Sequence, residues 1–135
     1  MRFAFKTSPQ RTTWDAMLQV WQAADDIAIF ESGWTSDHFY PTHSPDPAVP
    51  RLEGWITLTA LAQATSRLRM GTLVTGIHYR HPAVLANMAA TLDIVSGGRL
   101  ELGIEPAGTR RSPGPTASSW APRRSAATGW KRRAR

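Results

Sequence analysis

The feature that most constrains the fold is an alternation of two hydrophobic periods along residues 1–104. Short apolar runs typical of strands alternate with longer segments in which apolar residues recur every three or four positions, as on one face of a helix. The sequence predicts strands at 2–7, 28–35, 69–75 and 99–104, and helices at 13–25, 53–66 and from 82 to the glycine pair at 97–98. Connections of this length make neighbouring strands parallel, so the predicted class is α/β with the order βαβαβαβ.

Each predicted helix has one apolar face that should cover the sheet. Pro82 stands where the third helix begins, and Gly97 follows its end, which are the usual positions of these residue types. The expected inward residues are Trp14, Met17, Leu18 and Trp21 in the first helix, Trp55, Leu58 and Ala62 in the second, and Leu85, Met88, Leu92 and Val95 in the third.

Two architectures fit this pattern: an open doubly wound sheet and a (β/α)8 barrel. Four strands with three helices would make the N-terminal half of such a barrel, which needs about 250 residues. In both architectures ligands gather at the C-terminal ends of the strands. That rule indicates three places: Ser36 to His38, Thr72 to Gly76, and the segment after Ile104.

His38 is the candidate with the clearest chemistry. A histidine at a strand end exchanges protons near neutral pH or hydrogen-bonds an anionic ring. The alternative is a loop histidine that simply bonds to its neighbour Asp37. Likewise, residues 72–76 either bring the backbone close to a flat cofactor or are a plain strand end. Further histidines stand at 43, 78 and 81, but the chain has no cysteine to complete a zinc site, so no metal is predicted.

Charge divides the chain near Ile104. Residues 1–104 hold 8 Lys and Arg against 9 Asp and Glu, a balance of −1, whereas residues 105–135 hold 8 against 1, a balance of +7. The second segment also contains no Val, Ile, Leu, Met or Phe. We therefore predict a partial barrel domain at 1–104 and a disordered basic tail at 105–135. No apolar run is long enough to span a membrane, and the lack of cysteine suits a reducing, intracellular setting.

Four sequence blocks resemble the bacterial luciferase-like monooxygenase family, and in particular its deazaflavin-dependent oxidoreductase branch. The first block contains Asp37-His38-Phe39-Tyr40-Pro41. The blocks occur in the family's order and spacing, and they span Phe30–Pro41, Glu53–Thr65, Gly71–Ala83 and Asp93–Ile104.

The resemblance implies a TIM barrel oxidoreductase that carries out hydride or oxygen chemistry on a small organic substrate. It implies coenzyme F420 as the cofactor, with FMN as the alternative, a cytoplasmic location and homo-oligomers of the intact protein. By the same resemblance, Asp37 and His38 lie beside the cofactor ring, and His38 orients the ring or handles a proton. Leu73 and Val74 fall where the family often has a non-prolyl cis peptide bond in a bulge behind the ring, and Thr75 points toward the cofactor.

The chain departs from the family pattern after Ile104, where relatives usually continue with Gly-Ala-Gly-Trp-Asn and acidic residues. If suitable codons for that pentapeptide lose one G, the shifted reading frame encodes Glu105-Pro106-Ala107-Gly108. The same shifted frame turns codons for a later family segment into Thr116-Ala117-Ser118-Ser119-Trp120. We therefore expect a truncated, frameshifted product that is inactive as this chain.

A second hypothesis is that the chain binds nucleic acid or another polyanion through its basic tail. Arginine pairs at 110–111 and 123–124 and the basic run at 131–133 would contact phosphates, while Trp120 and Trp130 would stack on bases.

Overall fold

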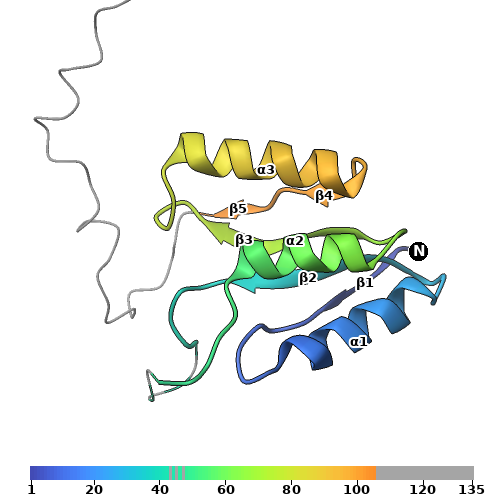
Figure 1. The fold of residues 1–135 in the computed structure, drawn as a ribbon, viewed down its shortest axis with the longest axis horizontal. Coiled ribbons are helices and arrows are strands. Elements are labelled where there is room, and N and C mark those ends of the chain that lie inside the picture. The colour runs from blue at the N-terminus through green and yellow to red at the C-terminus, as the bar shows by residue number, and fades with distance from the viewer. Residues whose placement is uncertain (43, 45, 47, 106–135) are drawn as a thin grey trace, which may run out of the picture.

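The computed structural model describes residues 1–105 except 43, 45 and 47. Its elements follow the predicted alternation of strands and helices (Figure 1). They are β1 (Phe3–Lys6), α1 (Trp14–Asp25), β2 (Phe30–Asp37), α2 (Gly54–Ala64), β3 (Arg69–Gly76), α3 (Pro82–Ser96), β4 (Leu100–Glu101) and β5 (Ile104–Glu105). The predicted tail lies outside the described residues, apart from Glu105.

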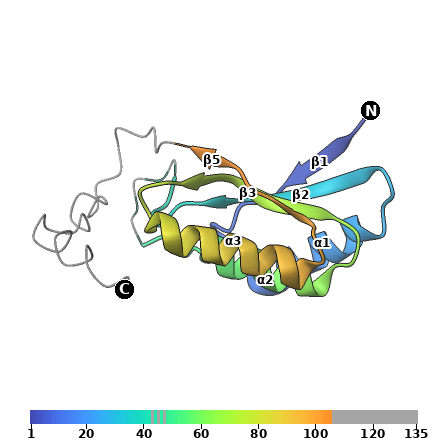
Figure 2. The ribbon, with the colours of Figure 1, turned by 90° about the horizontal axis from the view of Figure 1, so that it is seen from above.

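All described strand pairs are parallel, so the α/β class is confirmed. The strand order is β1-β2-β3-β4, and β5 also pairs with β3. The three helices lie on the same side of the sheet (Figure 2). This one-sided arrangement is what successive right-handed crossovers produce in a sheet that curls toward a barrel.

Strand β3 carries one extra residue between Thr72 and Thr75. On one side Thr72 pairs with Thr35 and Thr75 with Asp37, so three steps along β3 face two along β2. On the other side of β3, the same stretch lies between the residues that pair with β4 and the residues that pair with β5. A bulge of this kind interrupts the ladder, so the single final strand predicted at 99–104 is wrong and two short strands replace it. The Leu73–Val74 peptide bond inside the bulge is cis.

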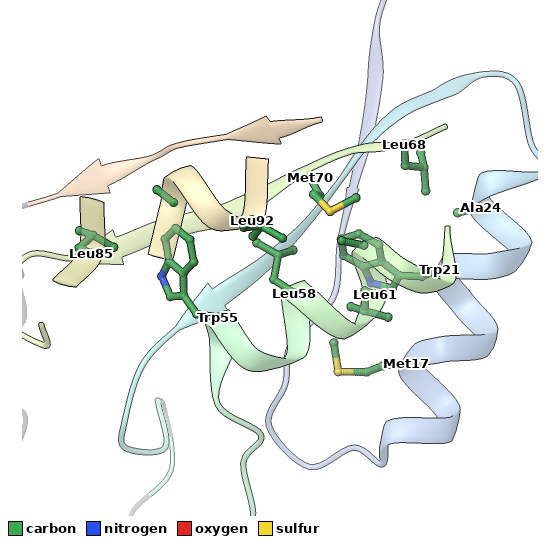
Figure 3. Close-up of a cluster of buried hydrophobic side chains, with 12 residues drawn as sticks. Met17, Trp21, Ala24, Trp55, Leu58, Leu61, Leu68, Met70, Leu85 and Leu92 are labelled. Atoms are coloured by element: carbon green, nitrogen blue, oxygen red, sulfur yellow. The ribbon is translucent and has the colours of Figure 1, made fainter. Parts of the chain in front are cut away.

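The hydrophobic core lies between the sheet and the three helices (Figure 3). The predicted inward residues of α2 are all buried, and Trp21 of α1 is fully covered. In α3, however, Val95 is 44% exposed and Ala89 is buried in its place. At 3.6 residues per turn Val95 lies about 80° around the helix from Leu85, whereas Ala89 lies about 40° from it. The described residues include no helix long and apolar enough to cross a membrane.

Two side chains satisfy main-chain groups where the helices end and the next strands begin. The Arg99 guanidinium donates to the carbonyls of Ala62 at 2.6 Å, Thr65 at 3.0 Å and Leu68 at 3.1 Å. Without it, carbonyls at the end of α2 would lack donors. Asp25 accepts main-chain N–H bonds at 66–68; burial alone would raise its pKa, but these bonds outweigh burial and lower it. Gly97, at φ 71°, ends α3 as predicted.

Candidate functional site

The C-terminal ends of β2 and β3 bring most of the predicted site residues into one region. Asp37 at the end of β2 is the Cα partner of Thr75 in β3, and His38 follows Asp37 directly. Leu73 and Val74 lie in the adjoining bulge, where Leu73 is 47% exposed. The region is therefore at the sheet edge where parallel α/β proteins bind ligands.

Asp37 is buried at the centre of an ion cluster. Its two carboxylate oxygens accept hydrogen bonds from Arg80 at 2.6 and 2.9 Å, and its side chain is fully covered. Arg80 also binds Glu53. Both carboxylate oxygens are thus bound by Arg80, and among the described residues no hydrogen bond joins Asp37 to His38.

Glu53 connects this cluster to the start of α2. Its second carboxylate oxygen accepts the N–H of Ile56 at 2.7 Å and caps the helix. A Cβ on Gly54 would lie 2.8 Å from the Ser36 carbonyl oxygen, so glycine is needed where α2 meets β2. The cluster therefore joins the end of β2, the start of α2 and the loop after β3.

Two stacked aromatic rings lie near Arg80, and one of them contacts its guanidinium. Its guanidinium lies 5.3 Å from the centre of the Phe39 ring, within the range of a cation–π contact. Phe39 in turn stacks on Tyr79, with ring centroids 4.3 Å apart and planes inclined by 20°. Burial, and secondly the charge of Asp37, raise the pKa of Tyr79. The phenol is therefore neutral near pH 7.

His38 is half-buried beside these groups. Burial is the main cause that lowers its pKa, and the positive charge of Arg51 lowers it further. The charge of Asp37 acts in the opposite direction but does not prevail. The imidazole is therefore neutral near pH 7 and offers one donor and one acceptor nitrogen.

The hydroxyl of Thr75 is buried beneath α2. It accepts a hydrogen bond from Trp55 Nε1 at 3.2 Å and contacts the Thr72 hydroxyl. The neighbouring hydroxyl of Thr35 is buried without a partner among the described residues. The three threonines form a polar layer between β2, β3 and α2.

Several participants were missed by the sequence reasoning. Arg80 and Glu53 stood inside blocks that resemble the family, but only the contacts of Arg80 with both Asp37 and Glu53 show their role. The predicted absence of a metal site stays a prediction. Within the described ranges the structure groups no three His, Asp or Glu side chains that could hold a metal, and His43 lies outside those ranges.

The chain matches the family model described as "Luciferase-like monooxygenase" over residues 1–111. Among curated relatives, it is 30% identical over 105 residues to an F420-dependent glucose-6-phosphate dehydrogenase of Amycolatopsis mediterranei, covering 77% of this chain and 31% of the relative. It is 33% identical over 97 residues to the oxygenase component of a flavin-dependent trigonelline monooxygenase of Acinetobacter baylyi, covering 70% and 25%. The chain thus spans a third or less of these relatives.

Solved structures agree with these matches. The coenzyme F420-dependent tetrahydromethanopterin reductase of Methanopyrus kandleri superposes with a TM-score of 0.63 at 28% identity, over 76% of this chain and 26% of that one. An F420-dependent secondary alcohol dehydrogenase gives a TM-score of 0.65 at 25% identity, over 76% and 31%. These neighbours are TIM barrels, of which the chain matches a part.

Breaking the buried ion cluster should destabilise the fold strongly. We expect Arg80→Met to lower the free energy of unfolding by about 3–5 kcal/mol, because the variant leaves Asp37 charged, buried and unpaired. Arg2→Gln is the matched control, since it removes an arginine whose side chain is 86% exposed and pairs with Glu31. The control should cost less than about 1 kcal/mol.

Urea unfolding of the full chain, followed by tryptophan fluorescence, measures both variants. Equal unfolding midpoints for Arg80→Met and Arg2→Gln would show that the cluster does not hold the site together. Adding Asp37→Asn to Arg80→Met should recover part of the loss, because the uncompensated charge is removed.

Proposed function

The chain belongs to the luciferase-like monooxygenase family, and we propose that residues 1–104 form the part of an F420-dependent oxidoreductase that faces the cofactor ring. The observation that carries the proposal is the placement of a neutral, half-buried His38 beside the β3 bulge. F420 and flavin both occur among the relatives, so FMN is the alternative cofactor.

His38 is the proposed catalytic residue and cofactor ligand. Its neutral imidazole can donate one hydrogen bond and accept another, and so can orient a ring or hold a proton at a ring nitrogen. Leu73 and Val74 would support the ring from the bulge, where Leu73 is exposed. Bound F420 would supply two-electron hydride transfer, which no side chain of this site provides.

Asp37 and Thr75 would contribute to the cofactor site indirectly. The carboxylate of Asp37 is occupied by Arg80, and the hydroxyl of Thr75 is occupied by Trp55. Their main chains nevertheless adjoin across the β2–β3 ladder and set the position of His38 and of the bulge. Their side chains therefore shape the site rather than touch the ring.

Full-length relatives act on small molecules such as glucose 6-phosphate. As part of the proposal, we infer that the intact protein also acts on a small organic substrate. We propose that this 135-residue chain does not itself catalyse the oxidoreductase reaction. The strands at 1–104 would be half of a barrel, which leaves the edges of β1 and of β4 without a neighbour in the described sheet. Homo-oligomerisation and a cytoplasmic location stay predictions.

Removing the imidazole should weaken cofactor binding. We expect His38→Ala to bind reduced F420 about tenfold or more weakly, because one hydrogen bond from the neutral imidazole to an anionic ring contributes about 1.5–3 kcal/mol. His78→Ala is the matched control, since His78 is an exposed histidine in the loop after β3. Fluorescence titration of the full chain gives both dissociation constants. Equal affinity of the two variants would refute the assignment of His38, and reduced FMN in place of F420 tests the alternative cofactor.

We propose that residues 105–135 are translated in a shifted frame. The codon argument at 105–108 and 116–120 supports this, and the tail's Arg, Pro, Ala and Ser content suits GC-rich DNA read out of frame. Sequencing the coding DNA checks it: restoring one base near codon 105 should open a long, family-like reading frame. Failure to find one would leave the tail as the gene's own sequence.

The second candidate function is polyanion binding by the tail, which the balance of +7 over residues 105–135 favours. We expect weak binding to single-stranded DNA, with a logarithmic affinity that falls linearly with the logarithm of salt concentration. Replacing Arg123, Arg124, Arg132 and Arg133 by Gln should flatten that slope, whereas Arg2→Gln should leave it unchanged. Fluorescence anisotropy measures both, and binding that does not respond to salt would contradict the proposal.

A further inference from the structure

The loops that follow β1 and β2 are joined side by side. Gln10 and Arg51 form an isolated antiparallel bridge, although about forty residues separate them. The Arg11 N–H donates to the Pro50 carbonyl at 3.1 Å, and the Leu52 N–H donates to the Pro9 carbonyl at 2.9 Å. The two loops therefore form one connected structure at the sheet end that carries His38.

Side chains extend this connection to His38 itself. Arg51 donates from Nη1 to the His38 carbonyl at 3.0 Å and from Nη2 to Gln10 Oε1 at 3.2 Å. Gln10 also donates from Nε2 to the Thr42 carbonyl at 3.1 Å, and its Oε1 accepts the Thr42 N–H at 2.8 Å. Arg51 and Gln10 thus hold the main chain at both ends of the turn from His38 to Thr42.

The charge of Arg51 has no carboxylate within ion-pair distance among the described residues. Its Nε is buried there without a hydrogen-bond partner, and burial lowers the pKa of the guanidinium, which stays charged at neutral pH. Four charged groups face His38 from the surrounding elements. They are Arg51 and Asp37 together with Lys6 of β1 and Glu105 of β5.

We propose that Arg51 is a positioning residue for His38: its planar fork fixes the His38 main chain, and its fixed charge faces the imidazole. The proposal rests on the role of His38 in the proposed function. It assigns separate tasks to the two arginines near β2. Arg80 compensates Asp37, whereas Arg51 disfavours the imidazolium form of His38, so the residue presents a donor and an acceptor to a bound ring.

The test measures His38 by NMR in the full chain without cofactor. In Arg51→Gln the pKa of His38 should shift upward, because the repulsion by Arg51 disappears while the attraction by Asp37 stays. Arg51→Lys keeps the charge and should keep the low pKa. Arg11→Gln is the matched control, since it removes an arginine of the neighbouring loop whose guanidinium donates to Ser44 Oγ, and it should leave the pKa unchanged.

Amide exchange at Thr42 reports on the positioning part. A lysine cannot reproduce the two-pronged contact of Arg51 with His38 and Gln10, so Arg51→Lys should lose exchange protection at Thr42 while the His38 pKa stays low. Gln10→Ala should lose the same protection without an upward shift of the His38 pKa. This separation of the two readouts supports the proposal.

An unchanged His38 pKa in Arg51→Gln would overturn the proposal, because Arg51 would then be only a loop contact. Unaltered Thr42 protection in both Arg51→Lys and Gln10→Ala would overturn it as well. These measurements need no cofactor. A failure of the proposed function would instead appear as equal F420 affinity of His38→Ala and His78→Ala, which leaves the Arg51 readouts interpretable.

Discussion

The buried carboxylate of Asp37 imposes the arrangement around which the rest of the site is built. A charged group without solvent is costly unless it is paired and hydrogen-bonded, and Arg80 meets this requirement with two bonds. Because Arg80 also binds Glu53, the loop after β3 and the first turn of α2 must converge on the end of β2. The close approach at Gly54 and the stacking of Phe39 on Tyr79 follow from this convergence.

The two ends of the sheet differ in where their charges are buried. At the end where helices stop and strands start, Arg99 and Asp25 satisfy main-chain carbonyl and N–H groups, and the ion pair of Arg2 with Glu31 is exposed. At the opposite end, the ion pair of Arg80 with Asp37 is buried, and charged groups surround a neutral histidine. This division matches parallel α/β architecture, in which one face carries stability and the other carries ligand contacts.

Local patterns predicted most of the fold. The alternation of hydrophobic periods identified each helix, and the buried face of α2 was found because its core residues repeat at helical spacing. The assignment of Val95 to the buried face was wrong. Ten residues from Leu85 do not complete a whole number of helical turns, so Val95 is rotated away from the face that Leu85 occupies. The split of the last strand was missed because its cause, the extra residue in β3, lies about thirty residues earlier.

The sequence by itself determined the class of fold, the strand ends at which Asp37 and His38 stand, and the change of composition near Ile104. These properties depend on hydrophobic period, turn chemistry and charge, which are local along the chain. Only the tertiary structure decided which charges meet. Asp37 lies 43 residues from Arg80, and Gln10 lies 41 from Arg51. Such pairings follow from burial and from the convergence of three loops at one sheet edge, and no spacing rule encodes them.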